Sequence, residues 1–109
     1  MATLGLIKVL HAEHGSKRHA HDFRIEVRLQ GTLKNDMVEG IDFHDVADAL
    51  AKVISPLQDQ YLNDIIGHAT VENIAIFIIK KLSVFPIQNV TVWEAEDRFV
   101  TIEVGEMND

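Results

Sequence analysis

The sequence predicts an α+β fold, in which an antiparallel sheet carries helices on one face and the order is strand, strand, helix, helix, strand, strand. Two observations lead to this prediction. Segments in which apolar and polar residues alternate lie near both ends of the chain, and segments with helical spacing occupy its middle. Strands grouped apart from the helices are typical of α+β layers. The 109 residues are expected to form one domain, residues 1–109.

The first two strands are expected at residues 3–12 and 19–30. The earlier segment, TLGLIKVLHA, is rich in residues that favour strands. The later segment, HAHDFRIEVRLQ, alternates strictly, so that His19 and His21 share one face with its apolar residues. This alternation indicates a half-buried antiparallel strand. The segment GTLKNDMVEG that follows is expected to be a turn-rich connection.

Two helices should occupy the middle of the chain. Asp42 is a suitable cap for a helix that runs to about Leu57, with Pro56 near its end, where a break is expected. After a loop, Thr70 is a suitable cap for a second helix, VENIAIFIIKKL, whose C-terminal lysines complement the helix dipole. This second helix is apolar over a wide arc, which indicates burial on two sides, including by a neighbouring subunit. Residues 89–95 and 98–104 then predict two strands joined by a hairpin.

Composition and charge exclude several classes of protein. The formal net charge of −7 is opposite to that of a typical nucleic-acid-binding surface. The chain has no cysteine, which excludes disulfides and thiolate metal sites. The N-terminus lacks the pattern of a signal peptide, and no apolar run reaches membrane-spanning length. We therefore expect a cytoplasmic protein that binds neither nucleic acid nor membranes.

Four of the six histidines lie in the stretch HAEHGSKRHAH. His19 and His21 are two residues apart in a strand and so point to the same face, and a tight turn would bring His14 beside them. Three imidazoles from one hairpin match the ligand set of a catalytic zinc site with a fourth position open for water or substrate. The alternative is that the histidines are only structural. Ordinary surface positions are expected for His11, His44 and His68.

Several acidic residues are candidates for function. Glu94 shares a strand face with two valines, and a carboxylate on a buried face is costly unless it is paired or binds a ligand. The alternative is that the strand ends at Trp93 and that Glu94 is solvated. Glu72 lies in the first turn of the second helix, where the helix dipole is sufficient to explain it. Turn chemistry likewise explains the loop residues Asp59 and Asp64.

Six segments in order along the chain resemble the motifs of the 6-pyruvoyl-tetrahydropterin and 6-carboxytetrahydropterin synthase family: LHAEH, HAH, DMVEGIDF, LQDQYLND, ATVEN and VTVWE. Each is weak alone, but their order and spacing are specific, and they cover nearly the whole chain. The resemblance implies the tunnelling fold, a four-stranded antiparallel sheet with two helices on one face. It also implies assembly into rings, commonly homohexamers, with active sites at subunit boundaries.

The resemblance further implies site residues. Zinc would be bound by His14, His19 and His21. Glu94 would anchor the ring of a pterin substrate, because a carboxylate can accept two parallel N–H bonds from the pyrimidine edge. Glu72 matches a second acid near the substrate.

The chain departs from the synthases in its proton-handling residues. The synthases carry a cysteine before the second histidine motif, where this chain has a shorter connection, GSKR, without one. Their relay Asp-His reads Gln58-Asp59 here. Relatives that replace the cysteine with an acid cleave 7,8-dihydroneopterin as aldolases. The resemblance therefore favours a zinc-dependent pterin lyase of this type, with Asp59 or Glu13 as the base and Lys17 as a third candidate.

Two alternatives stay open at this point. One is a 6-pyruvoyl- or 6-carboxytetrahydropterin synthase that acts on dihydroneopterin triphosphate with a substitute base, against which the missing cysteine counts. The other is a non-catalytic relative that binds pterin or metal without turnover. The retained histidines and Glu94 count against this second alternative.

Overall fold

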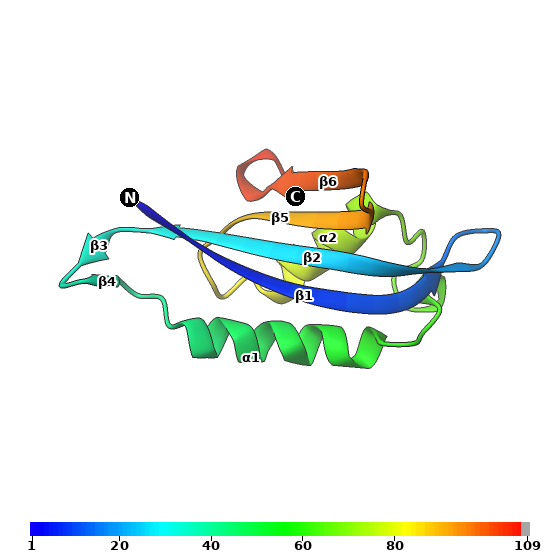
Figure 1. The fold of residues 1–109 in the computed structure, drawn as a ribbon, viewed down its shortest axis with the longest axis horizontal. Coiled ribbons are helices and arrows are strands. Elements are labelled where there is room, and N and C mark those ends of the chain that lie inside the picture. The colour runs from blue at the N-terminus through cyan, green and yellow to red at the C-terminus, as the bar shows by residue number, and fades with distance from the viewer. Residues whose placement is uncertain (108–109) are drawn as a thin grey trace.

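A computed structural model describes residues 1–107, which contain a four-stranded antiparallel sheet (Figure 1). The strands are β1 (Ala2–His14), β2 (His19–Gly31), β5 (Ile87–Ala95) and β6 (Arg98–Glu103), and they lie side by side in the order β1-β2-β5-β6. Within residues 1–107, the two outer strands, β1 and β6, each have one edge without a partner strand. The predicted pairing of strands at the two ends of the chain is confirmed, and each strand differs from its expected bounds by only one or two residues.

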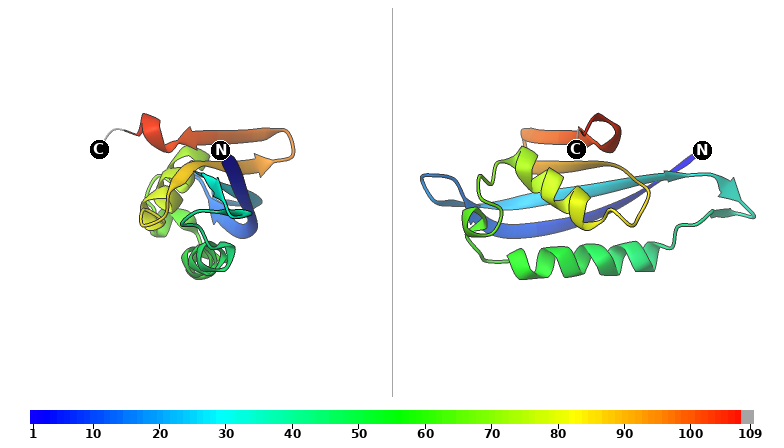
Figure 2. Two further views of the ribbon diagram at one scale, coloured as in Figure 1. Left: turned by 90° about the vertical axis from the view of Figure 1, so that its left-hand side faces the viewer. Right: turned by 180° about the vertical axis from the view of Figure 1, so that it is seen from behind.

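Two helices cover one face of the sheet, as predicted (Figure 2). Helix α1 (Phe43–Ile54) begins at Asp42, whose side chain accepts a hydrogen bond from a backbone N–H of the first turn. Helix α2 (Val71–Lys81) begins at Thr70, whose hydroxyl accepts a bond in the same way. Both caps are therefore the residues expected from the sequence. No helix within residues 1–107 has the length and apolar character needed to cross a membrane.

The first helix is shorter than expected. It ends at Ile54, and the chain continues as a single 3₁₀ turn over Ser55–Leu57. Proline has no N–H to donate to the carbonyl four residues earlier, so Pro56 breaks the α-helical pattern there. The connection after β2 also contains a short hairpin of β3 (Leu33–Lys34) and β4 (Met37–Val38), where only turns were expected.

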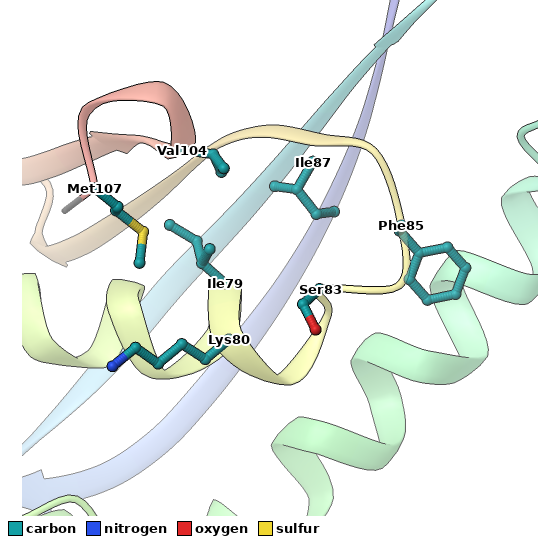
Figure 3. Close-up of a pocket in the computed structure, with 7 residues that line it drawn as sticks. All are labelled: Ile79, Lys80, Ser83, Phe85, Ile87, Val104 and Met107. Atoms are coloured by element: carbon teal, nitrogen blue, oxygen red, sulfur yellow. The ribbon is translucent and has the colours of Figure 1, made fainter. Parts of the chain in front are cut away.

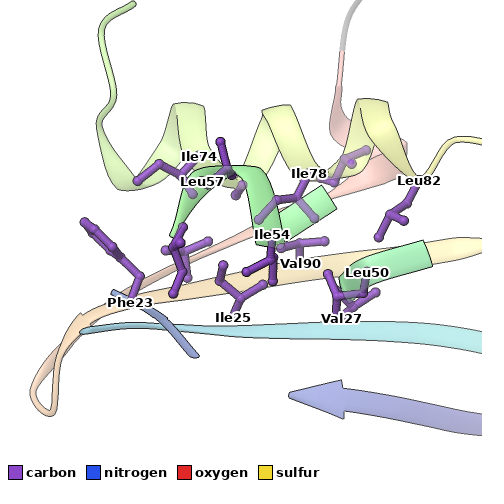
Figure 4. Packing of buried hydrophobic residues seen from close by; sticks show 14 of the residues in the cluster. Phe23, Ile25, Val27, Leu50, Ile54, Leu57, Ile74, Ile78, Leu82 and Val90 are labelled. Atoms are coloured by element: carbon purple, nitrogen blue, oxygen red, sulfur yellow. The ribbon is translucent and has the colours of Figure 1, made fainter. Parts of the chain in front are cut away.

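A single apolar core lies between the helices and the sheet (Figure 4). Phe23, Ile25 and Val27 of β2 point into it at every second residue, and the labelled residues of α1 and α2 approach from the other side. Phe23 is fully buried, and its ring lies 5.0 Å from that of His14 and 5.4 Å from that of His21, measured between ring centroids. The core thus extends to the histidines at one end of the hairpin and supports them.

Candidate metal centre

The hairpin formed by β1 and β2 brings three histidines together at its end. His14, the last residue of β1, pairs directly with His19, the first residue of β2, while His21 pairs with Ala12. Since alternate residues of a strand point to the same face, all three imidazoles lie on the face that carries the helices. Their ring centroids are 4.6 to 5.1 Å apart. The predicted convergence of these side chains is therefore what the structure contains.

Hydrogen bonds to backbone carbonyls orient two of the rings. Nδ1 of His14 lies 2.7 Å from the carbonyl oxygen of Ala69, and Nδ1 of His19 lies 2.5 Å from that of Lys17. A carbonyl oxygen can only accept, so both Nδ1 atoms must carry the proton, which leaves each Nε2 with a free lone pair. Histidines that bind metals are typically held in this way.

One ring nitrogen of His14 and one of His21 are buried without a hydrogen bond. Nε2 of His14 and Nε2 of His21 have no hydrogen bond within residues 1–107. A buried polar atom without a partner is uncommon and costly. Three imidazoles with converging free nitrogens are a donor set that suits zinc, and a metal ion would satisfy the unpaired atoms. The residues present therefore fit a divalent metal held by His14, His19 and His21.

Glu94 of β5 belongs to the same cluster. Its Oε1 lies 3.1 Å from Nε2 of His21 and 3.7 Å from Nε2 of His14. The ligand atoms of the four residues all lie within 4.8 Å of one another. Strand β5 continues to Ala95, so the alternative in which it ends at Trp93 is wrong. A register shift between Trp93 and Ala95 interrupts the pairing with β6 at Glu94, and irregularities of this kind often redirect a side chain beside a functional site.

Burial keeps His21 in the form that a metal requires. Desolvation lowers the pKa of His21 below its ordinary value of 6.5, although the nearby Glu94 carboxylate acts in the opposite direction. Only the neutral imidazole has a lone pair to offer to a metal. The lowered pKa of His21 therefore favours the neutral form that can bind a metal.

An open groove shares Glu94 with the cluster, although its side chains Asp22, Arg24 and Trp93 belong to the face of the sheet opposite the helices. The groove has a volume of about 540 Å³. The ring of Trp93 packs on Phe99 with 4.3 Å between centroids, and Nε1 of Trp93 is buried without a partner within residues 1–107. A flat aromatic surface beside charged groups is suited to a planar, polar ligand. The lining residues are Asp22, Arg24, Trp93, Glu94, Ala95 and Glu96.

The structure places the other predicted site residues outside the cluster. Glu13 points to the opposite face of the sheet, where Arg18 donates two hydrogen bonds to it, of 2.8 and 3.0 Å, and lowers the pKa of its carboxyl group. Asp59 is exposed in the loop after α1, with its backbone N–H bonded to the carbonyl of His11. Glu72 is exposed in the first turn of α2.

The loop that contains Asp59 holds the turn between β1 and β2, which the sequence did not indicate. The Tyr61 hydroxyl donates to the carbonyl of Gly15 at 2.6 Å, and the Asn63 side chain accepts from the N–H of Gly15 at 3.0 Å. Gly15 has a φ of 93°, and a Cβ at this position would lie 2.8 Å from Cε1 of His19. Only glycine combines this backbone conformation with such a close approach to a ligand ring.

One residue with a specific contact was missed. His11 was expected to be an ordinary surface histidine, but its Nδ1 lies 2.6 Å from Oδ1 of Asp22. The two residues are direct partners in the β1–β2 register, on the face opposite the helices. The hydrogen bond to Asp22 raises the pKa of His11 above 6.5. The strand pairing could have signalled this contact, but only once its register was known.

A second pocket lies elsewhere (Figure 3). It has a volume of about 340 Å³ and lies where the end of α2 meets the start of β5. None of its lining residues belongs to the histidine cluster, and Lys80 is its one charged residue. It therefore offers no acid, base or metal ligand set comparable with the cluster. The lining residues are Ile79, Lys80, Ser83, Phe85, Ile87, Val104 and Met107.

Fold and cluster together define an α+β protein with a metal-type ligand set at the end of a β-hairpin. The family model described as 6-pyruvoyl tetrahydropterin synthase matches residues 7–105. The chain therefore belongs to the 6-pyruvoyl tetrahydropterin synthase family, whose members act on pterins. This confirms the resemblance inferred from the sequence motifs.

Curated relatives point to two reactions within this family. An Archaeoglobus fulgidus protein with the provisional name 6-carboxy-5,6,7,8-tetrahydropterin synthase is 34% identical over 89 residues, which are 79% of this chain and 76% of that protein. The dihydroneopterin monophosphate aldolase of Pyrococcus furiosus is 27% identical over 96 residues, 84% of this chain and 82% of that enzyme.

Solved structures confirm the tunnelling fold. The structure of Caenorhabditis elegans 6-pyruvoyl tetrahydropterin synthase superposes with a TM-score of 0.83 at 17% identity, covering 94% of each chain. The Plasmodium vivax 6-pyruvoyl tetrahydropterin synthase gives a TM-score of 0.71 at 18% identity, covering 93% of this chain and 96% of that one.

Proposed function

We propose that this protein is a zinc-dependent pterin lyase that cleaves 7,8-dihydroneopterin, by an aldolase-type reaction, to 6-hydroxymethyl-7,8-dihydropterin and glycolaldehyde. The observation that carries the proposal is the cluster of His14, His19, His21 and Glu94, the last of which also lines an open groove. The absence of cysteine counts against the synthase reaction. The name of the Pyrococcus furiosus relative supports an aldolase and adds the monophosphate of the same pterin as a candidate substrate.

In this proposal the histidines of the cluster bind the metal, and the residues of the groove bind the pterin. His14, His19 and His21 would hold the zinc, which when bound supplies a Lewis acid beside the side-chain oxygens of the substrate. Glu94 would accept two N–H bonds from the pyrimidine edge of the pterin. Trp93 would lie along the ring and shield it from water. Glu72 would contact the substrate from the first turn of α2, which follows the Ala69 carbonyl that orients His14.

The reaction needs a base for one proton. Removal of the proton from the hydroxyl on the second side-chain carbon lets the bond between the first and second carbons break, so that the second carbon becomes the aldehyde of glycolaldehyde and the electron pair passes to the first carbon and the ring system. A proton then returns to the carbon that stays on the ring. Asp59 is the favoured base, because the ion pair with Arg18 lowers the pKa of Glu13 and makes that carboxylate a weaker base. The side chain of Lys17 is the third candidate.

Neither candidate carboxylate belongs to the metal cluster of its own chain, so we propose that the base comes from a neighbouring subunit of a homohexameric ring. Strand β6 and the part of β1 before Val9 each have an edge at which a second copy could pair, whereas residues 58–61 bond to the edge of β1 at residues 9–13. Apolar side chains on these strands support an assembly, since Ile7 and Val9 are 54% exposed and Phe99 is 57% exposed. A cytoplasmic location is part of the same proposal.

One assay tests the reaction. Zinc-loaded protein is incubated separately with 7,8-dihydroneopterin, its monophosphate and its triphosphate, and glycolaldehyde or its phosphate is measured together with the pterin product. Release of either aldehyde from the first two substrates supports the lyase. Turnover of the triphosphate alone supports the synthase alternative, which the name of the Archaeoglobus fulgidus relative favours. Binding without turnover of any of the three supports the non-catalytic alternative.

A further inference from the structure

The loop after α1 lies along the edge of β1 as a short added strand would. The N–H of Glu13 donates to the carbonyl of Gln60 at 2.9 Å, and Tyr61 forms a parallel β-bridge with Glu13. The N–H of Asp59 donates to the carbonyl of His11 at 2.7 Å. The loop thus uses backbone groups that an edge strand otherwise leaves unpaired.

Gln58 extends this pairing with its side chain. Its Oε1 accepts from the N–H of His11 at 2.9 Å, and its Nε2 donates to the carbonyl of Val9 at 3.0 Å. Because a primary amide has the same donor and acceptor as a peptide group, Gln58 pairs with β1 as a strand's backbone would. We propose that Gln58 is a positioning residue, which fixes Asp59 at the edge of β1 and thereby sets the rate of pterin cleavage. The second part rests on the proposed function, in which Asp59 is the base.

The position of Asp59 depends on hydrogen bonds more than on packing. Leu57 and Leu62 are buried and fix the two points at which the loop leaves the core and returns to it. Between them, Asp59 and Gln60 are exposed, and Asp59 has a φ of 60°, a conformation that residues other than glycine adopt infrequently. Bonds to β1 therefore hold these residues in place, and Gln58 makes two such bonds immediately before Asp59.

The Asp59 carboxylate lies near the strand residue to which Gln58 is bonded. The hydrogen bond to Asp22 is the main cause of the raised pKa of His11, and the charge of Asp59 adds a smaller increase. A general base must lie within reach of the proton that it removes, and a displacement of about 1 Å can cost about 10²-fold in rate. Loss of the two Gln58 bonds should therefore lower turnover through Asp59.

The first test needs no turnover. Hydrogen exchange of the Asp59 N–H is followed by NMR in the wild type, in Gln58→Met, which removes both side-chain bonds, and in the control Gln60→Met. Gln60 is exposed in the same loop, and its side chain makes only a 3.5 Å contact with the carbonyl of Gln58. We expect exchange at Asp59 to be about tenfold faster in Gln58→Met and unchanged in the control. Equal rates in the wild type and Gln58→Met would overturn the inference.

Gln58→Glu separates hydrogen bonding from shape. The side chain has nearly the same size, but an oxygen replaces the N–H group that donates to the carbonyl of Val9, and two acceptors repel each other. Exchange at Asp59 should again be faster than in the wild type. An unchanged rate would show that the loop does not depend on the amide and would overturn its strand-like pairing. Circular dichroism and zinc analysis verify that each variant is folded and retains its metal.

The second test measures cleavage of 7,8-dihydroneopterin by the zinc-loaded protein. Gln58→Met should lower kcat by about 10- to 10²-fold with KM unchanged, because a displaced base slows the chemical step without removing a contact to the substrate. Gln60→Met should match the wild type. A merely structural role of Gln58 would lower thermal stability but leave kcat unchanged at temperatures where the variant is folded. Wild-type kcat in Gln58→Met would therefore overturn the positioning role.

A double-mutant cycle identifies the residue through which Gln58 acts. Gln58→Met should have no further effect on kcat when Asp59→Asn is already present, since the group that it positions is then absent. The same fold loss in both backgrounds would overturn action through Asp59. If the wild type cleaves none of the three pterins, the proposed function fails and the kinetic part of this inference fails with it. The exchange test still decides in that case whether Gln58 holds the loop.

Discussion

The two faces of the β1–β2 hairpin carry histidines in opposite situations. On the face toward the helices, His14 and His21 are screened from water, and their Nε2 atoms make no hydrogen bond within residues 1–107 but lie near the Glu94 carboxylate. On the other face, the side chain of His11 is 56% exposed and is bonded to Asp22. Only a few residues of sequence separate the two situations. Because alternate residues of a strand point to opposite faces, one histidine-rich stretch contributes both to the metal-type cluster and to a surface ion pair.

The pKa values of the histidines on the two faces shift in opposite directions. Desolvation lowers the pKa of His21 and favours its neutral form, whereas the hydrogen bond to Asp22 raises the pKa of His11 and favours its cation. A neutral imidazole can bind a metal and a cation cannot. The side of the strand, rather than the residue type, therefore decides which histidines are candidate ligands. The predictions below test this division.

The largest effect is expected from removing a ligand on the helix face. His19→Ala should abolish stoichiometric zinc binding, because two imidazoles remain where three are needed, and metal analysis of the purified variant measures this. His44→Ala, which changes an exposed histidine of α1, is the control and should retain zinc. Full zinc retention in His19→Ala would refute the site.

A change in the loop after α1 should affect catalysis and leave the metal in place. Asp59→Asn should lower kcat for pterin cleavage by about 10²- to 10⁴-fold, the usual contribution of a general base, with unchanged zinc content. The matched control is Asp36→Asn, because Asp36 has a φ of 64° and Asp59 a φ of 60°, and asparagine tolerates this conformation. Glu13→Gln should have the smaller effect on kcat. Normal turnover in Asp59→Asn would transfer the role of base to another residue.

A third variant tests the turn that joins β1 to β2. Gly15→Ala should weaken metal binding, because its Cβ would displace the ring of His19, and it should also destabilise the fold by about 1–2 kcal/mol through the positive φ. Gly67→Ala shares the backbone cost, with a φ of 90°, but has no atom within 4 Å of its Cβ. Isothermal titration with zinc separates the two effects. Equal metal affinities in the two variants would show that the contact with His19 is unimportant.

The smallest effect concerns the exposed pair. NMR titration should give His11 a pKa above 6.5, and Asp22→Asn should remove this increase, whereas Asp48→Asn on α1 should not. Because the folded-state pKa is raised, the pair's contribution to stability is fully present below about pH 6.5 and is lost as the pH rises through the folded-state value. Urea unfolding at several pH values checks the sign. A pKa of His11 that is insensitive to Asp22→Asn would contradict the pair.

Much of the fold and the core of the site could be predicted because both depend on local periodicity. Alternation placed His19, His21 and Glu94 on one face, and a short turn was enough to bring His14 to them. The break expected near Pro56 is present, but α1 ends at Ile54 and not at about Leu57, because the proline prevents the apolar periodicity from continuing the helix to that point.

Contacts that depend on strand register or on distant segments could not be read from the sequence. The pairing of His11 with Asp22 follows from the register of β1 and β2, which alternation alone does not determine. The bonds from Tyr61 and Asn63 to Gly15 join segments that are more than 45 residues apart. Such contacts depend on how the finished elements pack, so they leave no pattern within any one segment.

The two bonds to Gly15 also bear on how long a bound metal would stay. The ends of hairpins ordinarily open and close on their own, and a ligand held there is released each time the strands separate. Here the loop that contains Tyr61 and Asn63 bonds to both the N–H and the carbonyl of Gly15. In addition, the ring of His14 is hydrogen-bonded to the carbonyl of Ala69, just before α2. Opening the tip therefore requires three segments to part together, which should make metal release slow even where affinity is modest.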